Sequence, residues 1–310
     1  MNNPNDTTEA TESSRIYSLF YSFFLIPLMM VVFGVLFYLL FAVITEEPSD
    51  INQLLIKLET GSMRDKANAS YRMNTIFFNE PTKYNSSYRN RIIKIHNMSK
   101  SEHLQDNTLR LHTIMIMGNS QDSAFGDVLI EELKSDKEEF RIKSIEALGK
   151  LKYISASDEI ENFLSDKYSF LEKLAAVGCL GNLGNENSIT QLVHLINKWP
   201  SEWLETDGPE LRWEATMALL KLGYSDSTTV SVINNLLDRN YYKGISNNNN
   251  YNTLDDNTIN FVIRKILHII SSIDNMSLIR PFSDKINYLS ENDPNLEIRD
   301  FAKKMYKQFR

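Results

Sequence analysis

A basic residue recurs along the second half of the chain at the start of helix-like stretches, and in every copy but one it directly follows an apolar residue. The clearest pairs are Phe140-Arg141, Leu211-Arg212 and Ile298-Arg299. A small side chain stands three residues after each arginine. The sixth residue after the arginine is small or apolar, and the seventh is large and apolar. Weaker copies open at Leu109-Arg110, Glu172-Lys173 and Ile263-Arg264.

The intervals between these basic positions are 31, 32, 39, 52 and 35 residues. Repeats of roughly 30–45 residues built from two helices are typical of solenoids. Glycine and proline are few, 11 and 8 of 310 residues, which also favours helices. We therefore predict an all-α fold in which residues 51–310 form an α-α superhelix of six or seven helical pairs. Such a fold is a surface for holding another molecule.

One unit shows the expected pair most clearly. Residues 127–134 carry apolar side chains on one face and predict the first helix, and residues 140–152 predict the second. Glycines are expected to end the second helices by adopting a left-handed conformation, as helix caps often require. These glycines are Gly149, Gly181, Gly184 and Gly223.

Residues 140–151, 211–223 and 172–184 resemble HEAT repeats of the short bacterial kind that also occurs in phycobilisome-lyase-like proteins. The resemblance is good over residues 106–237 and weaker on both sides. In that family the recurring basic residue commonly pairs with an acidic residue of a neighbouring repeat. The resemblance therefore implies a structural ladder of Arg110, Arg141, Lys173, Arg212 and Arg299. It implies the fold and leaves the binding partner open.

The N-terminal region contains an uncharged run, residues 16–45, between Arg15 and Glu46. About 20 apolar residues in a helix cross a hydrocarbon core, so we predict a transmembrane helix over 16–45. A polar, disordered tail (1–15) precedes it, and a short linker (46–50) follows. A cleaved signal peptide is the alternative, but its apolar region would be 7–15 residues long behind a basic start.

The flanking charges give the expected orientation. Lys57 and Arg64 lie on the C-terminal side of the span and Arg15 on the other, so the positive-inside rule favours a cytoplasmic C-terminal domain. Plentiful Asn, Ile, Lys and Tyr suggest a low-GC bacterial source, and hence the bacterial inner membrane.

Two insertions interrupt the repeat. Residues 198–209 contain Trp199 and Trp203, a residue type enriched at binding hot spots, and we regard both as candidate partner-binding residues; packing over adjacent helices is the alternative. Residues 240–257 are rich in asparagine and are expected to form a solvated spacer.

No motif in the sequence points to catalysis. None of the five histidines is followed by glutamate, and the nucleotide-binding and nucleophile-elbow motifs are absent. The single cysteine, Cys179, falls at a small buried position of its repeat. We predict no catalytic residues, no metal and no cofactor, and the net charge of −7 argues against nucleic acid as a partner.

These observations predict a membrane-anchored HEAT-repeat scaffold that docks a protein partner and is not an enzyme. An accessory subunit of a membrane transport complex and a lyase-type protein that handles a tetrapyrrole remain open as alternatives. So does a lipid-binding role for a basic cluster near the membrane, formed by Lys83, Arg89, Arg91 and Lys94.

Overall fold

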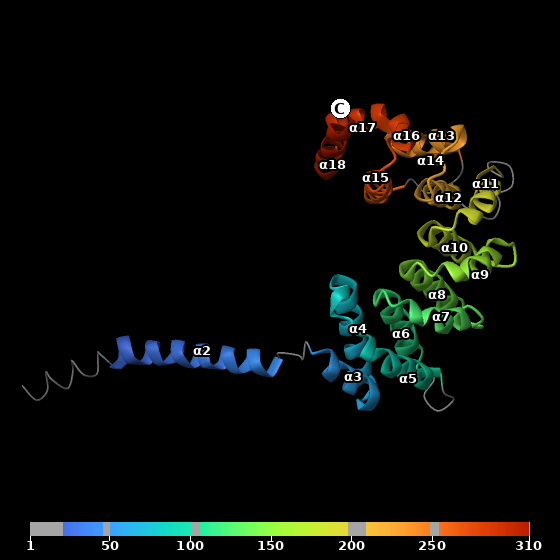
Figure 1. Ribbon diagram of the computed structural model, residues 1–310. Helices are drawn as coiled ribbons and strands as arrows, with labels where there is room; N and C mark the ends of the chain where they lie inside the picture. Colours follow the sequence, from blue (N-terminus) through green and yellow to red (C-terminus); the bar gives the residue numbers. More distant parts are fainter. Residues whose placement is uncertain (1–20, 46–49, 101–105, 198–208, 249–253, 310) are drawn as a thin grey trace, which may run out of the picture. The chain divides into compact units, whose positions relative to one another are not determined.

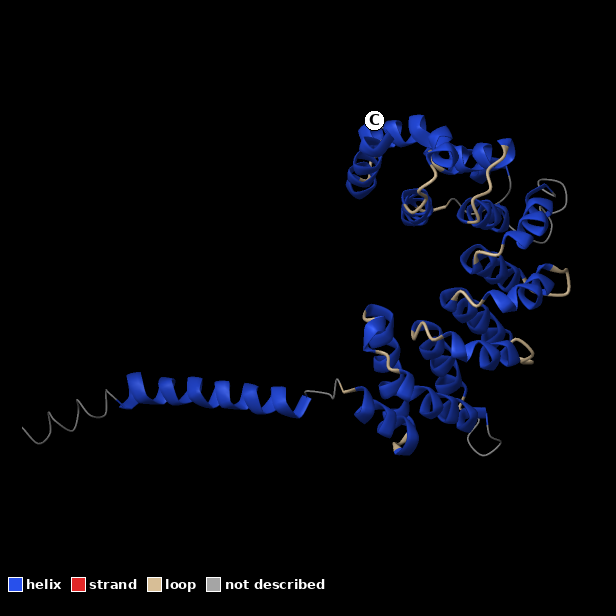
Figure 2. Ribbon diagram, viewed as in Figure 1, coloured by secondary structure: helices blue, strands red, loops and turns tan. Residues whose placement is uncertain are grey.

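The computed structural model describes residues 21–45, 50–100, 106–197, 209–248 and 254–309. Across these ranges the regular structure is helical and contains no strand (Figure 2), which confirms the all-α fold class. The chain divides into two compact units, Met1–Leu54 and Leu55–Arg310. The predicted tail lies outside the described residues.

The described part of the N-terminal unit contains one long apolar helix. A π-helical turn at Tyr21–Leu25 leads into α2 at Ile26–Thr45. The 20 residues of α2, at 1.5 Å each, span about 30 Å, the thickness of a hydrocarbon core. No side chain is buried in the window Phe23–Leu40. In length and composition this helix is able to cross a membrane, and a signal sequence near an N-terminus has the same properties.

The C-terminal unit is a succession of short helices (Figure 1). The first ones are α3 (Ile51–Thr60), which begins at the boundary of the two units, α4 (Met63–Asn79), α5 (Arg89–Lys100), α6 (Asn107–Asn119), α7 (Gly126–Glu132), α8 (Glu138–Leu151), α9 (Ser157–Glu161), α10 (Phe170–Leu183), α11 (Ile189–Asn197) and α12 (Pro209–Lys221). The even-numbered helices from α4 to α12 contact one another in order along the chain. This stacking of second helices is the solenoid arrangement that the repeats predict.

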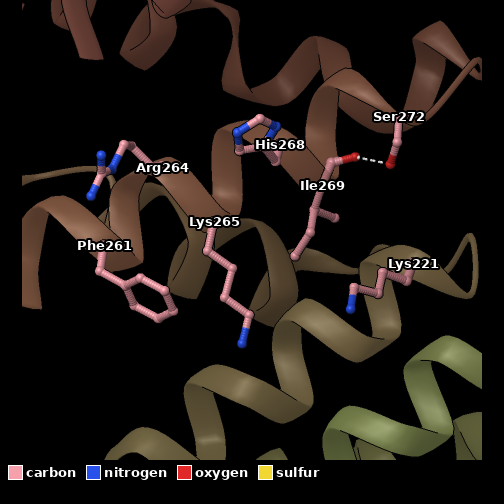
Figure 3. A pocket seen from close by; sticks show the side chains of 7 residues that line it. All are labelled: Lys221, Phe261, Arg264, Lys265, His268, Ile269 and Ser272. Atoms are coloured by element: carbon pink, nitrogen blue, oxygen red, sulfur yellow. Dashed lines mark hydrogen bonds between the residues drawn. The ribbon is translucent and has the colours of Figure 1, made fainter. Parts of the chain in front are cut away.

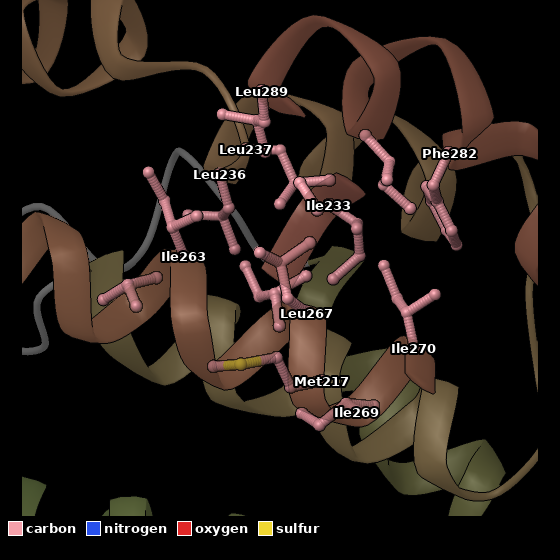
Figure 4. Close-up of a cluster of buried hydrophobic side chains, with 14 of the residues drawn as sticks. Met217, Ile233, Leu236, Leu237, Ile263, Leu267, Ile269, Ile270, Phe282 and Leu289 are labelled. Atoms are coloured by element: carbon pink, nitrogen blue, oxygen red, sulfur yellow. The ribbon is translucent and has the colours of Figure 1, made fainter. Parts of the chain in front are cut away.

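The remaining helices of this unit are α13 (Ser227–Leu236), α14 (Arg239–Asn248), α15 (Asp256–Ser271), α16 (Met276–Ile279), α17 (Ser283–Asn292) and α18 (Leu296–Tyr306). Their buried faces join that of α12 in one apolar cluster (Figure 4). Met217, Ile233, Leu267 and Phe282 are among its most buried members. Burial of about 1.5–3 kcal/mol per large apolar side chain holds this end of the unit together.

Side-chain caps determine where several second helices begin. Before α10, Ser169 accepts a hydrogen bond from the backbone of Glu172, and the Glu172 carboxylate accepts one from the backbone of Ser169. Asp106, Asp226 and Asp255 cap α6, α13 and α15 with a single carboxylate each. These contacts satisfy backbone N–H groups that the first helical turn leaves without partners.

Second helices of adjacent repeats approach each other through glycines. A methyl group placed on Gly118 of α6 would lie 2.7 Å from the Cβ of Ala147 in α8, and one on Gly181 of α10 would lie 2.7 Å from the Cα of Ala218 in α12. A methyl group placed on Gly149 of α8 would lie 3.2 Å from the Cα of Cys179 in α10. Each glycine stands eight residues after its repeat's basic residue, and its small partner stands six residues after the next one.

This contact corrects part of the sequence prediction. Gly184 and Gly223 adopt the expected left-handed conformation, with φ values of 75° and 78°. Gly149 and Gly181 instead lie inside α8 and α10, where the missing side chain allows the neighbouring helix to approach. The helix α8 ends at Lys152, which takes the left-handed conformation itself, with φ 51°.

The predicted asparagine-rich spacer is partly a packed helix. Tyr242 of α14 is buried, its hydroxyl donates to the Leu236 carbonyl over 2.6 Å, and its ring lies 5.8 Å from that of Trp213. Arg239 donates to both carboxylate oxygens of Asp293 over 2.8 Å. Two aromatic residues and one arginine within an otherwise polar segment account for this docking. Residues 249–253 lie outside the described part.

We predict that Gly181→Ala destabilises the protein. The added methyl group would meet the backbone of Ala218, and overpacking of this kind costs about 1–3 kcal/mol. That cost exceeds the roughly 1 kcal/mol by which alanine favours a helix over glycine. Urea unfolding followed by circular dichroism measures the change.

Gly178→Ala is the matched control, because it lies on the same helix and its methyl group would meet only the flexible carboxylate of Glu214, at 3.2 Å. We expect unchanged or slightly higher stability for this variant. Equal effects of the two substitutions would contradict the close-contact explanation.

Candidate functional site

Two adjoining cavities of about 450 and 500 Å³ lie along the second helices of the C-terminal unit. The first is lined by α8, α10, α12 and α15, and the second by α12 and α15. Lys265 of α15 lines both, so they form one surface, which we call the lysine groove after Lys150, Lys221 and Lys265.

Large apolar side chains are exposed along the lysine groove. Leu171 of α10 and Phe261 of α15 are 57% and 60% exposed, although both are residue types that cores normally bury. Leu174 and Ala175 of α10 line the same cavity as Leu171. Exposed apolar residues that gather in a concave surface indicate a place where another molecule packs.

The lysines of the groove differ in their partners. Lys265 forms an ion pair with Glu214 of α12. Lys150 instead donates to the amide oxygen of Asn119, and Lys221 to that of Asn182, both over 2.8 Å. Figure 3 shows Lys265 and Phe261 extending from α15 towards the side on which Lys221 lies.

An amide oxygen holds an ammonium group without neutralising its charge. In the described part of the chain, neither Lys150 nor Lys221 has a carboxylate within ion-pair distance. Loss of water around each ammonium lowers the pKa of both lysines. A lysine carries three donors, so each ammonium keeps hydrogen atoms with which to bind an anion.

The positions of these polar pairs repeat with the solenoid. Asn119, Lys150, Asn182 and Lys221 each stand nine residues after the basic residue of their repeat. They therefore project from equivalent positions of α6, α8, α10 and α12, and the pairing joins α6 to α8 and α10 to α12. This alternation of asparagine and lysine at one offset is the sequence signal that our sequence analysis missed.

The predicted ladder residues lie on the second helices, and several of them pair with carboxylates. Arg141 donates to Glu172 of the next repeat over 2.6 Å. Arg264, which was not among the predicted ladder residues, donates to Glu297 over 2.8 Å. Lys173 lies 3.7 Å from Asp166. Glu172 occupies the place of the apolar residue in its own repeat, so its departure from the pattern supplies the partner of Arg141.

The other ladder residues differ. Arg212 is partly buried on α12, and burial lowers its pKa. Arg299 is partly buried on α18, and among the residues that the structure describes no carboxylate forms an ion pair with it. The ladder is thus not one uniform series of ion pairs.

Arg110 belongs to a buried cluster around Glu132 of α7. The Glu132 carboxylate is fully buried and lies 2.8 Å from Arg110, 2.7 Å from Lys100 and 3.0 Å from His96. Hydrogen bonds and charges from these groups outweigh the effect of burial and lower the pKa of Glu132 to about 2. Removing one partner of a buried ion pair typically costs about 3–5 kcal/mol, because the other charge is left buried without a partner.

Trp199 and Trp203, the predicted partner-binding residues, lie outside the described residues. Three members of the basic cluster considered for lipid binding have acidic partners: Lys83 with Glu80, Arg89 with Asp122 and Arg91 with Glu59. Most of the charge of this cluster is therefore satisfied within the protein.

Cys179 is buried on α10, and burial raises the pKa of its thiol. It fills the small position that contacts Gly149. Over the described ranges, no three His, Cys, Asp or Glu side chains gather in an arrangement that would hold a metal ion.

Comparison with solved structures supports the fold. A chain in the structure of the complex of CpcE and CpcF of phycocyanin lyase from Nostoc sp. PCC7120 is similar to this protein, with a TM-score of 0.53 and 13% sequence identity. The match covers 86% of this chain and 98% of that chain. At that identity the likeness concerns the fold alone. It agrees with the HEAT-like solenoid that the repeats predict. No protein-family model and no curated protein matches the chain.

We predict that the protein loses stability as the pH falls below about 6.5, the pKa of an unperturbed histidine. Burial lowers the pKa of His96 and of His112 in the folded protein. The unfolded chain therefore binds more protons in this range, and the free energy of unfolding falls with pH. One proton contributes at most about 1.4 kcal/mol per pH unit.

His96→Gln should reduce that slope, because glutamine cannot be protonated and can still contact Thr113 and Glu132, the two partners of the ring. His194→Gln, a substitution on the exposed side of α11, is the matched control. Urea unfolding between pH 7 and pH 5 measures both. Identical slopes for wild type and His96→Gln would show that His96 does not titrate with folding.

Proposed function

We propose that this protein is a membrane-anchored HEAT-like scaffold whose C-terminal unit holds a protein partner in the lysine groove. The exposure of Leu171 and Phe261 beside uncompensated lysines carries this proposal, because such a surface gains both apolar contact and charge pairing when it is covered. The role is binding without catalysis. Cys179, the only thiol, is buried with a raised pKa and is unsuited to act as a nucleophile.

The anchor in this proposal is the apolar segment 16–45, of which the described part includes α2. Its length suits a bilayer, and no side chain in the window Phe23–Leu40 is buried. The flanking charges favour a C-terminal unit in the bacterial cytoplasm. An accessory subunit of a transport complex would fit the same anchor, and the identity of a co-purifying partner separates the two.

We predict that the full-length protein stays in the membrane pellet after an alkaline carbonate wash, because a spanning helix is held by the hydrocarbon core. Deletion of residues 16–45 should move it to the supernatant. Mass spectrometry of the N-terminus checks the alternative. A shortened, soluble product lacking this segment would identify a cleaved signal sequence and remove the anchor from the proposal.

We predict that Leu171→Ser combined with Phe261→Ser reduces recovery of the partner at least tenfold in a gentle-detergent pull-down from native membranes. Each exposed apolar side chain contributes about 1.5–3 kcal/mol when it is buried. Because both are exposed, the variant should fold normally, which circular dichroism verifies.

Ile154→Ser combined with Leu296→Ser is the matched control, since these residues are 55% and 66% exposed and do not line the groove. It should recover the partner as wild type does. A partner that both double variants retain would show that docking occurs elsewhere. Absence of any stoichiometric protein would contradict the scaffold.

A second candidate function is the handling of a tetrapyrrole. The fold match to a phycocyanin lyase complex supports it, and so does a groove of about 500 Å³ that offers apolar walls and lysines for propionate groups. Absorbance of the purified protein during titration with a bilin separates the candidates. A red-shifted absorbance band that appears without a protein partner would favour the tetrapyrrole-handling function. The variant Leu171→Ser with Phe261→Ser should abolish that band.

A further inference from the structure

The charges of the lysine groove define the chemistry of its occupant. Both carboxylates that line it already have partners, Glu146 with Lys143 over 2.8 Å and Glu214 with Lys265. Lys150 and Lys221 are held by asparagine oxygens, and the Lys150 ammonium also lies 5.6 Å from the centroid of the Phe78 ring. The groove thus has two lysines that form no ion pair with a carboxylate of its lining.

The two lysines are separated by a defined distance along the solenoid. Lys150 lies on α8 and Lys221 on α12, with α10 between them. Packed helix axes lie about 8–10 Å apart, so two steps place the lysine positions about 16–20 Å apart. An extended peptide rises about 3.3 Å per residue, and about five or six residues cover that distance.

Apolar residues of α10 lie on the surface between the lysines, beside the ion-paired Glu214. Leu174, Ala175 and Gly178 of α10 line this stretch of the groove, and Leu171 stands exposed beside them. A densely charged polymer such as a nucleic acid would bring phosphates against these residues and against the two lining glutamates. Anions separated by an apolar residue match the surface better.

We propose that the lysine groove binds an extended acidic segment of the partner protein, with two carboxylate side chains five or six residues apart and an apolar residue between them. One carboxylate binds the Lys150 ammonium and the other the Lys221 ammonium, while the apolar residue packs on α10. This inference rests on the proposed scaffold function and specifies the segment that the scaffold holds.

The asparagines contribute to this site by orienting the ammonium groups. Asn119 is buried and donates to Asn74 of α4 over 2.6 Å, so its oxygen is held in place for Lys150. Asn182 lines the groove itself and holds Lys221. Fixing each long side chain before binding reduces the entropy lost when a carboxylate arrives.

The test is selection of phage-displayed random dodecapeptides on the full-length protein in detergent micelles. We expect enriched sequences with two acidic residues at the stated spacing and an apolar residue between them. The labelled consensus peptide is then measured by fluorescence anisotropy. Its Kd should rise at least tenfold for Lys150→Gln with Lys221→Gln, and rising salt concentration should weaken binding to the wild type.

Two further variants control this measurement. Lys83→Gln with Lys134→Gln removes the same charge from exposed lysines outside the groove, each paired with a nearby glutamate, and should keep the Kd within twofold of wild type. Lys150→Arg with Lys221→Arg keeps both charges and should restore most of the affinity if the glutamine variant loses it.

Several results would overturn the inference. In the selection, these are enriched peptides without the acidic pair, or no enriched peptide at all. In the binding measurement, they are a Kd that the glutamine variant leaves unchanged, or lysine-dependent binding only of single-stranded DNA or of anionic phosphatidylglycerol vesicles. The scaffold itself fails separately. If binding of a native partner requires Leu171 and Phe261 but does not require the two lysines, the docking function is supported and the acidic-segment inference is wrong.

Discussion

Close contact between glycine and a small residue of the next helix is the constraint on which the repeated part of this structure depends. Gly118 against Ala147, Gly149 against Cys179 and Gly181 against Ala218 bring successive second helices together at equivalent points. Packing at this distance allows dispersion contacts along the whole of each helix. It also sets the register between neighbours, so the glycine at offset eight of one repeat meets the small residue at offset six of the next at each of these junctions.

That register explains why polar pairs recur beside the glycines. Lys150 reaches Asn119 and Lys221 reaches Asn182 because the position following each glycine lies at the edge of the same contact. The lysine groove is thus a product of the packing that stabilises the unit. Its apolar lining and its charges come from four helices that lie far apart in the sequence, α8, α10, α12 and α15.

The sequence predicted the fold well because a helical repeat shows its period directly in the spacing of residues. It predicted the role of individual glycines less well, since a glycine that ends a helix and one that admits a neighbouring helix look alike in one chain. Gly184 and Gly181, three residues apart, serve these different purposes. The groove was not predicted, because exposure of Leu171 and Phe261 depends on which face of each helix the neighbours cover. Trp199 and Trp203, chosen by residue type, remain a prediction outside the described residues.

The three glycine contacts have a consequence for how the chain is able to change length. From α6 to α12 every junction joins the same kind of surface to the same kind of surface, so a duplicated or deleted helix pair would meet matching partners on both sides. This modularity ends at α12, where Leu220 stands eight residues after Arg212 in place of glycine and belongs to the C-terminal apolar cluster. The helices after α12 therefore pack through a different surface, while the repeats from α6 to α12 share one kind of glycine junction.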